Sequence, residues 1–302
     1  MFITESMVMD LSGKNTVETL LQMKQRGEKI SQLTCYDYST ARLVDAAGIN
    51  SILVGDSLGM TMQGYETTLP VTMEEMIVYA RSVVRGCQNA FVIVDMPFMS
   101  YQASVEQALE NAGRLIKETG ANAVKLEGGA AVTAQIKAIV DAGIPVCAHI
   151  GMTPQSVNIF GGFKVQGKGE ANARRVLEDA LAVQEAGAFM VVLECIPPKL
   201  AALITSKVEM ITIGIGAGAG CDGQVLVYQD MLGMDVDFTP KFVRRFAEIG
   251  EAMTNAFRDY DAAVKAGSFP ATEQSFVKSD CTDAFLQQLD AEYPGKSENE
   301  KQ

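Results

Sequence analysis

The chain has 302 residues, of which 48% are hydrophobic and 21% charged, and its formal net charge is −12. This composition suits one large globular domain or two small ones. The basic residues are scattered and form no stripe that could meet nucleic-acid phosphates, and no apolar run approaches the roughly 20 residues that span a bilayer. We therefore expect neither a nucleic acid nor a membrane as a partner.

The N-terminus and the cysteines indicate the compartment. Residues 1–5 lack the basic region and the apolar core of a signal peptide. The six cysteines contain no Cys-x-x-Cys pair, and three of them lie in strand-like runs, where they are expected to act as small buried hydrophobes (Cys35, Cys147 and Cys195). We expect the protein to be cytoplasmic.

Strand-like and helix-like segments alternate along the first half of the chain. A first helix is predicted from a cap at Asn15 or Thr16 to Gln25. Strands are then expected at 30–36, 51–54, 91–94 and 122–126. Helices closed by a glycine stop signal are expected at 39–47, 72–85, 104–118 and 131–142.

The second half repeats the pattern, with strands expected at 145–150, 189–193, 210–213 and 224–228 and helices at 171–186, 198–205 and 240–265. About eight such units favour a (β/α)8 barrel over an open doubly wound sheet. We expect a lead-in at 1–14, a single barrel domain at 15–278 and an extension at 279–302. The charged and polar end of that extension, 290–302, is predicted to be disordered.

The second predicted strand ends in Gly55-Asp56-Ser57, which places an acid and a hydroxyl at its carboxyl end. In parallel α/β proteins, ligands bind at these ends. Taken alone, however, an Asp or Ser after a strand more often caps the next helix. The functional interpretation therefore depends on matching groups from other strands.

The next four strands supply such groups at or near their carboxyl ends, namely Asp95, Lys125 with Glu127, His149 and Glu194. Each could have a structural explanation, such as a turn residue, an ion pair or a satisfied core histidine. Burying several charges at one rim costs several kcal/mol per ion unless a metal or substrate compensates. Their coincidence at equivalent positions therefore favours a functional site.

Three of these acids suggest a metal. Asp56, Asp95 and Glu127 follow successive strands, so their carboxylates can converge. Hard oxygen donors without a nearby cysteine or second histidine suit Mg²⁺ and argue against zinc. A magnesium ion could hold an oxyanion substrate and polarise its carbonyl group.

Two loops are unusual. The glycine-rich run at 214–220 is a weak dinucleotide fingerprint, and it could mark either close approach to a phosphate or a tight turn. The long loop at 151–167 is rich in amides and aromatic residues, which is typical of an active-site cover.

Six segments together resemble the ketopantoate hydroxymethyltransferase family over roughly residues 14–277. They are Val54-Gly-Asp-Ser-Leu-Gly-Met60, Thr68-Leu-Pro-Val-Thr72, Asp95-Met-Pro-Phe98, Val124-Lys-Leu-Glu-Gly-Gly129, His149-Ile-Gly-Met-Thr-Pro-Gln-Ser156 and Gly214-Ile-Gly-Ala-Gly218. The resemblance implies a (β/α)8 barrel of the phosphoenolpyruvate/pyruvate type. It also implies transfer of a hydroxymethyl group from 5,10-methylenetetrahydrofolate to 3-methyl-2-oxobutanoate, which forms ketopantoate for pantothenate and coenzyme A synthesis.

The same resemblance implies residue roles, a cofactor and an assembly. It assigns Mg²⁺ to Asp56, Asp95 and Glu127, and the general base to Glu194. It assigns binding of the oxoacid to four residues, with His149 beside them (Asp56, Ser57, Asp95 and Lys125). The family uses a magnesium-stabilised enolate and forms a large homo-oligomer, commonly a decamer.

Three alternatives remain open. An Mg²⁺-dependent oxoacid carbon–carbon lyase of the isocitrate lyase type usually carries a cysteine in its catalytic loop, and none occurs between Cys147 and Cys195. A phosphate- or flavin-binding oxidoreductase would leave the ionisable strand ends unexplained. A non-catalytic ligand-binding barrel would make Glu194 dispensable.

Overall fold

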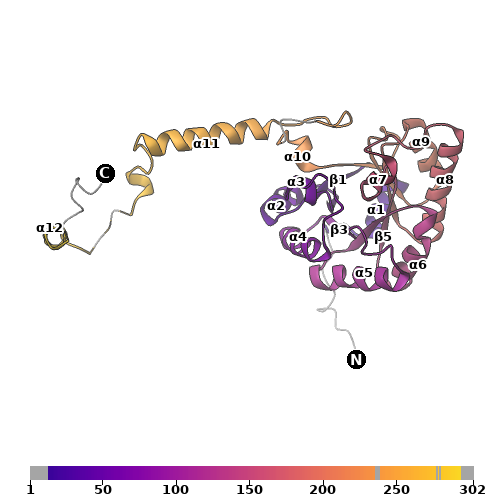
Figure 1. Ribbon diagram of the computed structural model, residues 1–302, viewed down its shortest axis with the longest axis horizontal. Helices are drawn as coiled ribbons and strands as arrows, with labels where there is room; N and C mark the ends of the chain where they lie inside the picture. Colours follow the sequence, from indigo (N-terminus) through magenta and orange to yellow (C-terminus); the bar gives the residue numbers. More distant parts are fainter. Residues whose placement is uncertain (1–12, 235–238, 277, 279, 294–302) are drawn as a thin grey trace, which may run out of the picture. The chain divides into compact units, whose positions relative to one another are not determined.

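The computed structural model describes residues 13–234, 239–276, 278 and 280–293. Eight parallel strands pair in chain order, and the last pairs with the first, which closes the barrel (Figure 1). They are β1 (Ile30–Thr34), β2 (Ser51–Val54), β3 (Phe91–Asp95), β4 (Ala123–Glu127), β5 (Val146–Gly151), β6 (Met190–Glu194), β7 (Ile211–Ile215) and β8 (Gly223–Leu226). The predicted (β/α)8 barrel is confirmed.

Helices alternate with the strands and surround the barrel. The longer ones are α1 (Val17–Gln25), α2 (Tyr38–Ala46), α4 (Met73–Gly86), α5 (Val105–Thr119), α6 (Thr133–Asp141), α8 (Glu170–Glu185) and α9 (Pro198–Lys207). Thr16, Thr72 and Ser104 cap α1, α4 and α5 by accepting hydrogen bonds from backbone N–H groups, and Gly120 ends α5 in a left-handed conformation.

The core has two layers. Apolar residues that face outward from the strands pack against the helices, while a second cluster fills the barrel interior. Leu20 of α1 belongs to the interior cluster together with Ile93 and Ile213, and all three are fully buried. Because α1 closes one end of the barrel in this way, the carboxyl end of the strands remains for ligands.

Four helices were not predicted. They are α3 (Leu58–Thr61), α7 (Val157–Phe160), α10 (Tyr228–Met231) and α12 (Asp283–Glu292). The first three have four residues each, which is too few to show a helical period, whereas α12 has ten. The helix α12 includes the first residues of the segment that we predicted to be disordered, which corrects that prediction for 290–292. Residues 294–302, like 1–12 of the lead-in, lie outside the described residues.

The helix predicted at 240–265 is wrong at its start. The helix α11 is Ile249–Lys265, and the described residues before it form turns in which the Phe246 N–H donates to the Met231 carbonyl at 2.7 Å. Contacts divide the chain into two compact units, Met1–Glu248 and Ile249–Gln302, and all eight strands belong to the first. The barrel domain expected at 15–278 extends across this division and stays a prediction. Across the described residues, no helix combines the length and apolarity needed to cross a membrane.

Candidate active site

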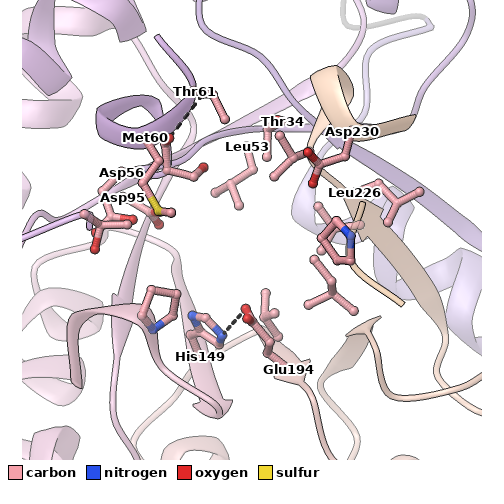
Figure 2. Close-up of a pocket in the computed structure, with 18 of the residues that line it drawn as sticks. Thr34, Leu53, Asp56, Met60, Thr61, Asp95, His149, Glu194, Leu226 and Asp230 are labelled. Carbon is pink, nitrogen blue, oxygen red and sulfur yellow. Dashed lines mark hydrogen bonds and ion pairs between the residues drawn. The ribbon is translucent and has the colours of Figure 1, made fainter. Parts of the chain in front are cut away.

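A cavity of about 1010 Å³ lies at the carboxyl ends of the strands. Every site residue predicted from the sequence lines it: Asp56, Ser57, Asp95, Lys125, Glu127, His149 and Glu194. Figure 2 shows the acids Asp56 and Asp95 on one side of the opening and His149 with Glu194 on another. The structure therefore brings the predicted set together.

Strand register places Asp95 beside Lys125. These residues are partners in the β3–β4 pairing, and the Lys125 Nζ lies 2.8 Å from the Asp95 Oδ1, with both side chains almost fully buried. Burial raises the pKa of Asp95, while the Lys125 ammonium opposes that rise. Burial disfavours the charged form of Lys125, but the carboxylates of Asp95, Glu127 and Asp56 outweigh it and raise the lysine pKa. The pair is an ammonium and a carboxylate held inside the barrel.

Asp56 is adjacent to this pair. Its backbone N–H donates to the Asp95 Oδ2 at 3.0 Å, and only 3% of the residue is exposed. Burial, and then the charges of Asp95 and Glu127, raise the pKa of Asp56 well above its usual range. The carboxylates therefore carry more negative charge than Lys125 alone neutralises.

Ser57 does not cap the following helix. It occupies the N-cap position of α3 but makes no side-chain cap hydrogen bond, and its Oγ lies 2.8 Å from the Tyr36 hydroxyl instead. Gly55 allows this approach, because a Cβ there would lie 2.8 Å from the Ser57 Oγ. Ser57 therefore does not act as the helix cap that was the alternative explanation for this residue.

Glu127, His149 and Glu194 form a second charged group. Register pairs Glu127 with His149, and the imidazole lies between two carboxylates, with Nδ1 3.3 Å from the Glu127 Oε1 and Nε2 3.2 Å from the Glu194 Oε2. Burial and the Lys125 charge lower the pKa of His149, but hydrogen bonds to Glu127 and Glu194 outweigh them and raise it to about 9. A protonated His149 forms an ion pair with each carboxylate, which keeps Glu194 beside it.

Gly151 allows β5 and β6 to meet at this point. It has φ +94°, and a Cβ would lie 2.4 Å from the Glu194 carbonyl oxygen, which instead accepts from the Met152 N–H at 2.9 Å. The side chain of Glu194 is 15% exposed, whereas those of His149 and Glu127 are 3% exposed. Glu194 is thus the acid of this group that solvent or substrate can reach most readily.

Gln155 is the residue that our sequence reasoning missed. Its amide Nε2 donates to the Asp56 Oδ2 at 2.8 Å and to the Met96 carbonyl at 3.0 Å, and its Oε1 accepts from the Tyr101 hydroxyl at 2.7 Å. Its backbone N–H donates to the Glu127 Oε2 at 2.9 Å. The residue lies in the His149–Ser156 motif and in the predicted cover loop, and that amide-rich loop was the available signal.

The three predicted metal ligands are not arranged as a closed site. Among the described residues, no group of three or more His, Cys, Asp or Glu side chains is placed to hold a metal ion. The two Glu127 carboxylate oxygens face Gln155 and His149. Asp56 and Asp95, however, are adjacent buried carboxylates with excess negative charge. Magnesium is usually held by one or two carboxylates with water and substrate oxygens, so this donor set fits it.

The glycine-rich run at 214–220 packs against the chain itself. Cβ atoms added at Gly218 and Gly220 would lie 2.6 Å from Pro198 and 2.8 Å from Ala202, both on α9, and Gly216 similarly approaches Phe242. None of these glycines lines the cavity. The tight-turn interpretation is therefore favoured over a phosphate loop.

Comparisons with known proteins show the family of this chain. The model of the family described as ketopantoate hydroxymethyltransferase matches residues 14–272. The chain belongs to this family. A relative from Clostridium novyi, named 3-methyl-2-oxobutanoate hydroxymethyltransferase, is 64% identical over 263 residues, which are 87% of this chain and 96% of the relative. A relative of the same name from Enterococcus faecalis is 61% identical over 88% of this chain and 97% of the relative. The predicted family and hydroxymethyltransferase class are confirmed.

Solved structures with similar folds are more distant. A phosphoenolpyruvate phosphomutase from Streptomyces platensis has a TM-score of 0.57 at 15% identity, covering 91% of this chain and 93% of its own. A 2,3-dimethylmalate lyase, described as a member of the PEP mutase/isocitrate lyase superfamily, has a TM-score of 0.54 at 14% identity, covering 91% and 98%. These likenesses confirm the predicted barrel type and show the fold alone, so they do not favour the lyase alternative.

Proposed function

We propose that this enzyme transfers a hydroxymethyl group from 5,10-methylenetetrahydrofolate to 3-methyl-2-oxobutanoate and so makes ketopantoate for pantothenate and coenzyme A synthesis. Family membership supports the substrates, because the relatives carry the name of this reaction. The observation that carries the proposal is the meeting of five strands' ionisable ends in one cavity, with the Glu194 carboxylate directed into it beside His149 (Figure 2).

The reaction requires loss of the proton on C3 of the oxoacid. Glu194 is the proposed base, because it is the more exposed carboxylate of its group and His149 fixes its orientation. Lys125 and Ser57 are proposed to bind the carboxylate and keto oxygens, and the negative charge that develops on the keto oxygen is stabilised by the buried Lys125 ammonium. C3 then bonds to the methylene carbon of the donor. The bonds from that carbon to the two folate nitrogens break, water supplies the hydroxyl oxygen, and tetrahydrofolate leaves.

We propose that Mg²⁺ is held by Asp56 and Asp95, with Glu127 joined to Asp56 through Gln155. When bound, the ion would neutralise the carboxylates and supply positive charge to the substrate oxygens. The raised pKa of Asp56 supports this assignment, because it reports buried negative charge that a cation would relieve.

The assembly follows from the resemblance, and the compartment from the cysteine pattern. We propose a cytoplasmic homo-oligomer, with a decamer as the expected form, and with the oxoacid and folate as its small-molecule partners. Native mass spectrometry of the full chain would report the subunit number directly. A stable monomer would contradict the proposal.

The activity is tested by incubating the purified chain with both substrates, with and without Mg²⁺, and measuring ketopantoate by mass spectrometry. We expect product only with the metal. Absence of product at every magnesium concentration would contradict the proposed reaction. Cleavage of a carbon–carbon bond in larger oxoacids would instead support the lyase alternative.

A further inference from the structure

The cavity is larger than the oxoacid requires. Its volume of about 1010 Å³ reaches the upper end of the roughly 300–1,000 Å³ that encloses drug-sized ligands, whereas the proposed oxoacid has only five carbons. The seven predicted site residues make up only part of its lining. The remaining space is therefore large enough for a second ligand.

The rest of the lining mixes polar residues with large, partly exposed apolar side chains. We call Met60, Tyr65, Phe163 and Phe242 the apolar wall; their exposed fractions are 36%, 39%, 58% and 38%. Exposed aromatic and methionine side chains around a cavity are typical of a ligand site, because burying them on binding is favourable. Flat conjugated rings pack well against such residues.

Two members of the wall are fixed by contacts of their own segments. The loop that carries Phe163 is tied to the rim, since the Gln166 N–H donates to the Cys195 carbonyl at 2.9 Å. Phe242 lies against Gly216, where an added Cβ would be 3.1 Å from the phenylalanine ring. The segments of Phe163 and Phe242 are therefore held in place, and both side chains line the same cavity as Glu194 and Cys195.

An acid faces this space from another element. Asp230 of α10 follows the carboxyl end of β8, and Figure 2 shows its side chain directed toward the opening, across from Glu194. A carboxylate can accept two parallel N–H bonds, and a reduced pterin offers an adjacent ring N–H and amino group in that arrangement. An apolar surface beside a carboxylate matches the pterin better than a second oxoacid, which is anionic.

We propose that the apolar wall and Asp230 form the binding site for the pterin ring of the one-carbon donor. This inference rests on the proposed function, and it names the residues that would hold the folate. The ring lies over Met60, Tyr65, Phe163 and Phe242, its ring N–H and amino group donate to Asp230, and the methylene carbon is thereby presented to the oxoacid beside Glu194.

The test distinguishes effects on folate binding from effects on the reaction of the oxoacid. Phe163→Leu and Phe242→Leu keep apolar bulk but remove the rings, and Asp230→Asn keeps shape but replaces one acceptor oxygen with a donor. We expect each to raise the KM for methylenetetrahydrofolate and the Kd of tetrahydrofolate, measured by calorimetry without oxoacid, by at least about tenfold, or about 1.4 kcal/mol. Deuterium exchange at C3 of the oxoacid alone should stay within about twofold, because loss of a wall contact leaves Glu194 in place.

Two matched variants serve as controls. Phe246→Leu changes the same residue type in the same segment but outside this cavity, and Glu66→Gln changes another acid that lines it. If the wall variants weaken tetrahydrofolate no more than these controls, or reduce C3 exchange as much as transfer, the assignment is overturned. Binding of a tetrahydropterin without the aminobenzoyl-glutamate tail would support it. If wild type showed no C3 exchange, the proposed function would fail, yet the calorimetry would still decide the pterin site.

Discussion

The side-chain amide of Gln155 donates a hydrogen bond to the Asp56 carboxylate at 2.8 Å, although the two residues are 99 positions apart in the chain. The same amide group also bonds Met96 and Tyr101, so one residue of the loop after β5 joins the ends of several strands. Both Gln155 and Asp56 are buried. The carboxylate is therefore held in a fixed orientation by a residue outside the barrel strands.

Replacing Gln155 with Leu should lower both stability and activity. Three buried partners would lose their bond, and each unsatisfied group costs about 1–3 kcal/mol. We expect a lower free energy of unfolding in urea and a reduced kcat, with Gln155→Glu failing to restore activity because it brings a further acid to Asp56. The control is Gln166→Leu, whose amide donates only to the Lys164 carbonyl on an exposed loop. Equal effects of the two Leu variants would contradict the assigned role.

The Lys125–Asp95 pair should be strongly coupled. Lys125→Met leaves Asp95 buried without its cation, which should destabilise the protein by about 3–5 kcal/mol. Adding Asp95→Asn removes the unpaired charge, so the double variant should recover part of that loss. A double-mutant cycle from urea unfolding in EDTA measures the coupling. Additive effects of the two substitutions would show that the 2.8 Å contact is not an energetic pair.

The stability of the metal-free protein should fall as the pH rises from about 6.5 to about 9. The folded protein holds the His149 proton up to a pKa of about 9, whereas the ordinary value is 6.5, so the folded state binds more protons within this window. The contribution is complete below pH 6.5 and lost above 9, and it is at most about 3 kcal/mol. Lys125, Glu127 and Glu194 are the charged groups around the imidazole.

A comparison of wild type with His149→Gln in EDTA isolates this contribution. The difference between their free energies of unfolding should shrink as the pH is raised from 6 to 9.5. A difference that is constant across this range would mean that His149 is neutral in the folded protein.

Magnesium should stabilise the chain. A ligand at 100 times its Kd adds about 2.7 kcal/mol, which a thermal melt readily detects. We expect Mg²⁺ to raise the Tm of wild type and to leave Asp56→Asn and Asp95→Asn unchanged, with Glu127→Gln weakening the response. The control Glu66→Gln should respond as wild type does. A normal shift in the Asp95 variant would exclude Asp95 as a ligand.

The ends of β2 to β6 were predictable because each of these strands is a short apolar run with an ionisable residue at or near its end. Strand periodicity also carries Lys125 and Glu127 to the same face. Closure of the barrel then brings these strand ends together, so a prediction of the barrel is also a prediction of the site. Gln155 could not be found in this way. It belongs to a loop without periodicity, and its importance comes from contacts with residues distant in the chain.

The misplaced start of α11 has a similar cause. Residues 240–248 alternate apolar and basic side chains in a way that fits a helix, but Phe246 bonds to Met231 and Phe242 packs at Gly216. Contacts made outside the segment overrode its local pattern. The short α3 was missed for the related reason that the segment after Ser57 is too short to show a period.

The central claim is that Glu194 removes the C3 proton of the oxoacid, and deuterium exchange measures this step directly. Wild type with Mg²⁺ and 3-methyl-2-oxobutanoate in D2O should incorporate deuterium at C3 without folate, as followed by proton NMR. Glu194→Gln should still bind the oxoacid, yet exchange at least about a hundredfold more slowly, in the range typical of general-base loss. Exchange at the wild-type rate in this variant would contradict the account.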